Sequence, residues 1–156
     1  MAEKEAMKKK RKVVLASGTF DLLHMGHVKY LEEAKKTGGE NAELIVIVAR
    51  DKTVEKRKGA KPVVPEDHRR ALVEALEVVD EAILGFEDFS MDKVIEKISP
   101  DIIAVGHDQK SIIRQVQEVI ARKELNIEVA KIGKFGKDEL NSSLKIKRKI
   151  IELYRK

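Results

Sequence analysis

The sequence predicts an α/β domain built on a doubly wound parallel sheet, with helices on both faces. Short apolar runs rich in Val, Ile and Leu recur along the chain, and segments with apolar residues at helical spacing separate them. Strands that are apolar without alternation are buried on both faces, and their alternation with helices is typical of parallel sheets. The length of 156 residues suits one domain, which we place at residues 13–156.

Five short apolar segments are predicted as strands because they are brief and rich in β-branched residues. Gly18, Gly85 and Gly106 end three of them, as expected where a parallel strand turns toward the next helix. The last segment alternates between apolar and polar positions, which is typical of an edge strand. The predicted strands cover residues 13–16, 44–49, 81–84, 102–105 and 127–132.

Segments with helical periodicity follow each predicted strand. Pro65 opens one of them, and the Gly38-Gly39 pair closes another. The predicted helices cover residues 26–37, 65–76, 91–98 and 112–120, with a last one from Ser142 onward. Residues 56–59 are interpreted as a loop. Right-handed crossovers make this arrangement Rossmann-like, and ligands then bind beyond the carboxyl ends of the strands.

Composition excludes several classes of protein. The chain has no cysteine, which rules out disulfides, thiolate catalysis and cysteine metal sites. The longest apolar run, residues 44–49, is far too short to span a membrane. The basic start lacks the apolar segment of a signal peptide. We therefore expect a soluble, cytoplasmic protein without membrane association.

The charge is unevenly distributed along the chain. Residues 1–12 carry six positive and two negative charges, whereas residues 13–130 carry 17 positive and 22 negative. We interpret residues 1–12 as a basic, flexible, solvated tail. Nucleic-acid binding through this tail is not favoured, because basic residues of such proteins usually cluster on an element that reads a groove.

The turn after the first strand is chemically distinctive. It carries Gly18-Thr19-Phe20-Asp21 and then His24-Met25-Gly26-His27, which opens the first helix. The N-terminus of a helix presents free N–H groups and attracts anions. Two histidines three residues apart lie on the same side of a helical turn. This pattern favours a phosphate site, although a capping or core role for either histidine stays open.

A zinc site and the two common glycine-rich nucleotide-binding loops are less consistent with the sequence. A zinc site would need a third ligand, and no suitable residue stands nearby. The chain has neither a Walker A loop nor the Gly-x-Gly-x-x-Gly dinucleotide fingerprint.

These two motifs resemble the signature of the cytidylyltransferase-like nucleotidyltransferase superfamily, and the similarity extends from about Val13 to Tyr154. The resemblance implies catalytic roles for His24 and His27, and for Lys56 and Lys58, which would cover the nucleotide phosphates. It also implies nucleotide or phosphate contacts at Gly18, Thr19, Phe20, Gly26, Arg69, Gly106, Asp108, Ser142 and Ser143.

Structural roles remain open for several of these residues. Asp108, Ser142 and Ser143 could serve only as helix N-caps. The basic run at 56–58 could be a solvated surface. The common version of the last motif reads Ile-Ser-Thr-Thr, and Leu144 departs from it.

The superfamily joins a nucleoside triphosphate to a phosphate monoester and releases pyrophosphate. A phosphate dianion needs no base to activate it, so such catalysis depends on alignment and stabilisation of charge. The resemblance implies a divalent ion, Mg²⁺, held mainly by the nucleotide phosphates, with no protein metal site. It also implies a homodimer.

Several stretches are most similar to archaeal FAD synthase, which transfers AMP from ATP to FMN. They comprise residues 43–51, 61–66, 79–85 and 100–103, with Asp108-Gln109 and Ser142-Ser143. That group often carries cysteines near its C-terminus, which this chain lacks. The alternatives are glycerol-3-phosphate cytidylyltransferase, another sugar-phosphate nucleotidyltransferase, or a nucleotide-binding regulator. The aromatic candidates for a flavin pocket, Phe20, Phe86, Phe89 and Phe135, stand in no recognisable motif.

Overall fold

A five-stranded parallel sheet forms the centre of the computed structural model, which describes residues 11–88, 90–136 and 140–155. The strand order is β3-β2-β1-β4-β5, and every neighbouring pair is parallel. This confirms the predicted fold class. The strands are β1 (Val13–Gly18), β2 (Glu43–Val48), β3 (Glu81–Leu84), β4 (Ile102–Gly106) and β5 (Glu128–Ile132).

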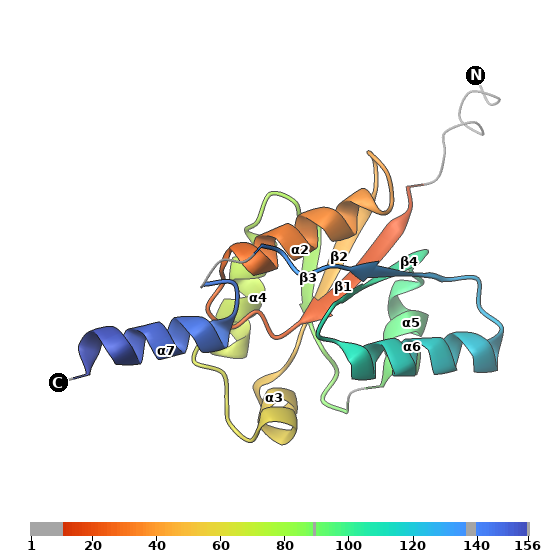
Figure 1. The fold of residues 1–156 in the computed structure, drawn as a ribbon. Helices are drawn as coiled ribbons and strands as arrows, with labels where there is room; N and C mark the ends of the chain where they lie inside the picture. Colours follow the sequence, from red (N-terminus) through yellow and green to blue (C-terminus); the bar gives the residue numbers. More distant parts are fainter. Residues whose placement is uncertain (1–10, 89, 137–139, 156) are drawn as a thin grey trace.

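Helices cover both faces of the sheet (Figure 1). The helices of the described residues are α2 (Met25–Lys36), α3 (Asp51–Lys58), α4 (Glu66–Glu74), α5 (Met91–Ile98), α6 (Lys110–Lys123) and α7 (Ser143–Tyr154), of which α2, α4, α5 and α6 pack on the sheet. Successive strand residues face opposite ways, so Val14 packs with α2 and α4, whereas Leu15 packs with α5 and α6. Two apolar clusters result, one on each face of the sheet.

The region after β2 differs from the sequence-based interpretation. Residues 56–59 were expected in a loop, but Asp51–Lys58 form the helix α3, which ends at Gly59 with a left-handed φ of 77°. The helix predicted over 65–76 ends earlier, at Glu74. α3 escapes a periodicity search because Val54 is its only buried residue within the described structure.

The direction in which strands are added to the sheet reverses at β1. This reversal determines where a ligand-binding site is expected. β1 lies between β2 and β4, so the chain builds the sheet outward from β1 in one direction and then in the other. At such a switch point the connections leave on opposite faces and open a crevice beyond the carboxyl ends of the strands. Gly18 and Gly106 stand at that edge, at the ends of β1 and β4.

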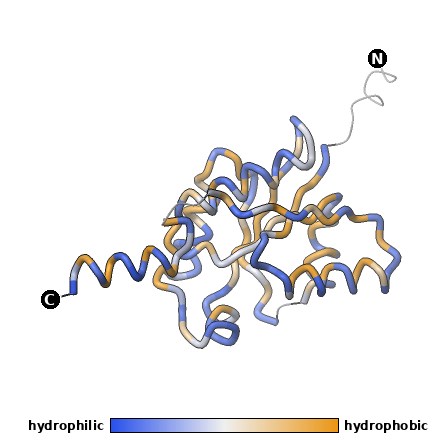
Figure 2. The backbone as a smooth tube through the Cα atoms, viewed as in Figure 1, coloured by the Kyte–Doolittle hydropathy of each residue, from blue (hydrophilic) through white to orange (hydrophobic). Residues whose placement is uncertain are grey.

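The two ends of the chain differ from the body. Residues 1–10 of the predicted basic tail lie outside the described residues. Arg11, which we assigned to that tail, donates a hydrogen bond to the carbonyl of Asn41, and the Lys12 carbonyl accepts from the Glu43 N–H. At the other end, α7 projects from the domain (Figures 1 and 2). Among the described residues, no helix is long and apolar enough to cross a membrane.

Candidate active site

A cavity of about 370 Å³ lies at the carboxyl end of the sheet. The turn after β1, the loop after β4, the segment after β5, the end of α3 and the starts of α2 and α7 enclose it. Every residue predicted for the site lines this cavity except Lys56 and Arg69. The residues brought together are Gly18, Thr19, Phe20, His24, Gly26, His27, Lys58, Gly106, Asp108, Ser142 and Ser143.

The two histidines form a stacked pair at the start of α2. Their ring centroids are 3.7 Å apart, and the backbone N–H of His24 donates to Nδ1 of His27 at 3.3 Å. The pKa of His27 is lowered to about 3, chiefly by burial; the charges of His24 and Lys58 also lower it, and that of Asp21 opposes them. Burial also lowers the pKa of His24. Because Nδ1 of neutral His27 accepts a hydrogen bond, its proton lies on Nε2, which is left to donate.

His24 Nδ1 is a buried atom without a hydrogen-bond partner among the described residues. A buried polar atom left unpaired costs about 1–3 kcal/mol. Such atoms are tolerated where a ligand can pair them. This observation fits a site that is completed by a polar ligand.

The turn that carries the histidines has an uncommon backbone. Phe20 and Leu22 adopt left-handed φ values of 55° and 52°, a conformation that costs a non-glycine residue free energy and clusters at functional sites. Phe20 is 3% exposed, and its ring lies 5.4 Å from that of His27. Its main role in this structure is therefore to support His27.

Gly26 allows α2 and the start of α7 to approach each other. A Cβ at this position would lie 2.8 Å from the ring of His24 and 2.9 Å from the carbonyl oxygen of Asn141. The close approach brings the N-termini of both helices to one cavity, where their free N–H groups favour an anion.

The segment before α7 is fixed by its own polar contacts. Ser142 caps the helix, its Oγ accepting a hydrogen bond from the Lys145 N–H at 3.2 Å. The Asn141 side chain donates to the carbonyls of Phe135 and Gly136 and accepts from Lys145. The expected capping role is thus present, and Ser143 lines the cavity beside it.

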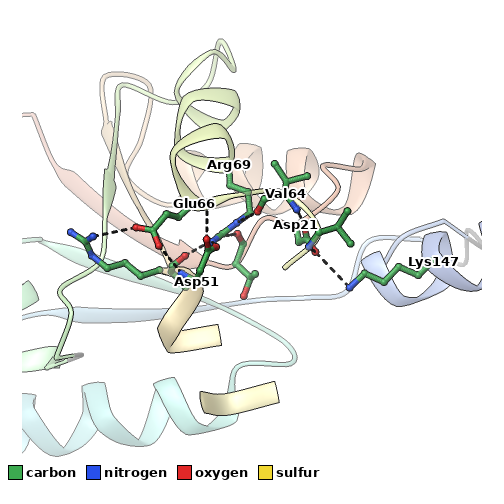
Figure 3. A network of polar contacts seen from close by, with 10 residues as sticks. Asp21, Asp51, Val64, Glu66, Arg69 and Lys147 are labelled. Carbon is green, nitrogen blue, oxygen red and sulfur yellow. Dashed lines mark hydrogen bonds and ion pairs between the residues drawn. The ribbon is translucent and has the colours of Figure 1, made fainter. Parts of the chain in front are cut away.

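Asp21 joins three parts of the site, as Figure 3 shows. Its carboxylate accepts hydrogen bonds from the Val63 and Val64 N–H groups at 2.8 and 2.9 Å, and it lies 3.6 Å from the Lys147 ammonium. The β1–α2 turn, the segment before α4 and the helix α7 are therefore held together by one nearly buried carboxylate.

Arg69 does not have the phosphate-contacting position that the sequence suggested. Its side chain is fully buried, and its guanidinium donates to the carbonyls of Thr19, Ala49 and Val64 and to the Asp51 carboxylate. These donors are consumed inside the protein (Figure 3). Arg69 instead fixes the β1–α2 turn against the start of α3.

The basic residues of α3 point in different directions. The side chains of consecutive residues leave a helix in directions about 100° apart. Lys56 and Lys58 are two residues apart, so their side chains leave nearly opposite sides of α3. Lys58 lines the 370 Å³ cavity, whereas Lys56 lines a neighbouring cavity of about 660 Å³. Arg57, which the sequence analysis passed over, lines both cavities.

Two further residues, Gln109 and Tyr30, belong to the cavity although no role at the site was predicted for them. Gln109 accepts from the Gly106 N–H at 2.9 Å and donates to the Ser17 carbonyl at 2.9 Å, which ties the ends of β4 and β1 together. Tyr30 lines the cavity, and its hydroxyl donates to the Ala104 carbonyl at 2.8 Å. Burial raises the pKa of Tyr30. Its position three residues after His27, on the same helix face, is a signal that could have found it.

The described residues contain no group of three or more histidines, aspartates or glutamates that could hold a metal ion. Asp21 is already engaged by two N–H groups and Lys147. Asp108 also lines the cavity. The protein therefore offers no dedicated metal cage in its described part.

Comparison with known proteins defines the class of protein first. Residues 15–149 match the family described as cytidylyltransferase-like, and the chain belongs to that family. Its fold and its histidine pair at a helix N-terminus are consistent with this membership.

Individual relatives narrow the class. The chain is 50% identical to FAD synthase of Methanobrevibacter smithii over 139 residues, covering 89% of this chain and 90% of the relative. It is 48% identical to FAD synthase of Methanothermobacter marburgensis, covering 89% and 85%. A crystal structure titled lipopolysaccharide core biosynthesis protein, from Thermoplasma volcanium, is 41% identical with a TM-score of 0.73, covering 81% of this chain and all of that one.

Proposed function

We propose that this chain is an FMN adenylyltransferase, which transfers AMP from ATP to FMN and so forms FAD and pyrophosphate. The observation that carries the proposal is the stacked, neutral pair His24 and His27 at the start of α2, in a cavity that the start of α7 also lines. Identity of 50% and 48% to proteins named FAD synthase supports ATP and FMN as the two substrates.

The reaction is a direct displacement at the α-phosphorus of ATP. A phosphate oxygen of FMN forms a bond to that phosphorus while the bond to the β,γ-pyrophosphate breaks, and the pyrophosphate leaves with the bonding electrons. The second pKa of a phosphate monoester is near 6, so the nucleophile is mostly a dianion at neutral pH and needs no general base. The protein has to align the two phosphates and stabilise the charge that develops.

The residues of the cavity are suited to these tasks. The N-termini of α2 and α7 attract phosphate oxygens through their N–H groups. The His27 ring is neutral. Its Nε2–H can therefore donate a hydrogen bond to a phosphate oxygen without bringing a positive charge into the cavity. Lys58 and Arg57 line the cavity and form no ion pair with another described residue. Lys58 provides positive charge for the leaving pyrophosphate, and Arg57, which also lines the neighbouring cavity, provides it for the acceptor phosphate.

Mg²⁺ would neutralise part of the negative charge when it is bound with ATP. The donors present fit an ion held mainly by phosphate oxygens, with Asp108 as the cavity carboxylate able to contribute one ligand. The roles of Gly18, Thr19, Gly106, Ser142 and Ser143 at the nucleotide belong to the same proposal. Since its substrates include ATP, we place the enzyme in the cytoplasm.

We further propose that the chain acts as a homodimer. α7 has no buried residue among those described, and Leu144, Ile150, Ile151, Leu153 and Tyr154 are all exposed. An isolated helix shorter than about 12–15 residues is marginal in water, yet α7 supplies Ser143, and its N-cap Ser142, to the cavity. A second copy is the one partner that is present whenever the enzyme is.

A turnover assay with chromatographic detection tests the proposed reaction. Purified protein with Mg²⁺ receives FMN, glycerol-3-phosphate or a sugar 1-phosphate, each with ATP and with CTP. We expect FAD and pyrophosphate from FMN plus ATP alone. CDP-glycerol, or a nucleotide sugar in place of FAD, would contradict the proposed acceptor. ATP binding without product from any pair would contradict transfer to FMN and favour either another phosphate monoester or a nucleotide-binding regulator.

A further inference from the structure

A second cavity, of about 660 Å³, adjoins the one that holds the histidines. The two share Ser17, Gly18, Arg57, Gln109 and Ser111 in their linings. Among the described residues, Arg57 is the only charged side chain that lines both. The two cavities therefore form two chambers that meet at the end of β1, with one cation at the junction.

The second chamber differs in chemistry from the first. Its apolar lining includes Phe86, Ile47 and Ile112, which belong to the apolar cluster under α5 and α6. Gln115, on the exposed side of α6, supplies an amide that can both donate and accept. Ligand pockets commonly have volumes of about 300–1,000 Å³ and combine apolar walls with a few polar groups.

We infer that this second chamber holds the isoalloxazine ring of FMN, with the FMN phosphate at the junction beside Arg57. The inference rests on the proposed function and adds the location of the flavin, which no sequence motif reveals. The ring is flat and largely apolar, and one edge carries two carbonyls and an N–H. Phe86, Ile47 and Ile112 match the apolar part, and Gln115 matches the polar edge.

The direction of the reaction supports this division between the chambers. In an in-line displacement the attacking and leaving oxygens lie on opposite sides of the phosphorus. ATP with its triphosphate in the histidine chamber therefore needs the acceptor phosphate to come from another side. The second chamber shares Gly18 and Arg57 with the histidine chamber, and an acceptor phosphate placed beside these residues would reach the α-phosphate.

Two glutamines on α6 provide a matched test. Gln115 lines the second chamber, whereas Gln117, two residues later, is exposed and lines neither chamber. A tryptophan at 115 would fill the space assigned to the flavin. We expect Q115W to raise the KM for FMN about tenfold or more, which corresponds to at least about 1.4 kcal/mol. The KM for ATP should change less than about twofold, and Q117W should match the wild type.

FMN fluorescence anisotropy gives a readout that does not depend on turnover. FMN titrated with wild-type protein should show saturable binding, which Q115W weakens and Q117W preserves. Riboflavin, which has the same ring but no phosphate, should inhibit competitively against FMN and not against ATP.

The outcomes separate this inference from the proposed function. If wild-type protein forms no FAD but binds FMN, and Q115W weakens that binding while Q117W preserves it, the proposed reaction is wrong while the flavin chamber stands. If FAD forms and Q115W leaves both the FMN affinity and the KM for FMN unchanged, or raises the KM for ATP instead, the assignment of the chamber is overturned.

Discussion

At the scale of single residues, the distinctive feature is a histidine that stays neutral inside the cavity proposed to bind phosphates. His27 is buried, stacked on His24 and close to Lys58, and each of these factors disfavours the imidazolium. A neutral ring with Nδ1 engaged has one defined donor, Nε2–H. Its donating role therefore does not change with pH over the neutral range.

The same burial predicts a pH dependence of stability. The pKa of His27 is about 3 in the folded protein and near 6.5 in the unfolded chain, so between these values the unfolded chain binds more protons. Stability then rises with pH through this window and falls as the solution is acidified below about 6.5. Urea unfolding from pH 7 to 4 should show a smaller acid loss in H27Q than in the wild type. An equal loss in both would contradict the buried, neutral imidazole.

At the scale of elements, α3 and α4 are connected by a polar network rather than by apolar contacts. Glu66 accepts from the Asp51 N–H and pairs with Arg50, and Arg50 donates to the Gly85 carbonyl. With Arg69 at its centre, this network sets the start of α3 relative to the ends of β1 and β3. It thereby orients the helix that carries Lys56, Arg57 and Lys58.

Replacing Arg69 should therefore affect stability before it affects substrate binding. R69M leaves the Asp51 carboxylate and three carbonyls without their donor, and breaking a buried pair in this way costs about 3–5 kcal/mol. We expect a loss of that size in urea unfolding at neutral pH. R70M, which removes a half-buried guanidinium bonded to Glu74 and to the Ala82 carbonyl, serves as the control and should cost less. Unchanged stability with a raised KM for ATP would restore the phosphate-contacting role that the sequence suggested.

Sequence patterns predicted the sheet and most residues that line the cavity, because both depend on residues that are close together in the sequence. Buried parallel strands are short apolar runs, and Gly26, His24 and His27 lie in one contiguous turn. Local signals could not show that Arg69 and Lys56 lie outside this cavity. Whether an arginine faces a ligand or a set of carbonyls depends on contacts between distant segments, and α3 carries too few apolar residues for its helical geometry to show.

At the scale of the whole molecule, α7 stands out because none of its described residues is buried. Its start lines the cavity, and Lys147 pairs with Asp21, while Ile150, Ile151 and Leu153 are exposed. A dimer that covered this surface would also hold Ser142 and Ser143 in place at the cavity. Dimerisation and activity are then coupled through one helix.

A double substitution on α7 tests that coupling. I150K/L153K places two charges on the apolar side, and E152K changes the polar side as a control. Multi-angle light scattering should show a dimer for wild type and E152K and a monomer for I150K/L153K, with turnover reduced in the monomer. A wild-type monomer, or a fully active monomeric variant, would contradict the proposed dimer.

The most direct test of the central claim separates binding from chemistry at His27. In H27A, single-turnover formation of FAD should fall about 100-fold or more, as expected when one donor to developing charge is removed. ATP affinity, measured by calorimetry without FMN, should weaken less than about tenfold. An equal loss in rate and ATP affinity would make His27 a binding residue only, and an unchanged rate would show that the reaction does not depend on this histidine pair.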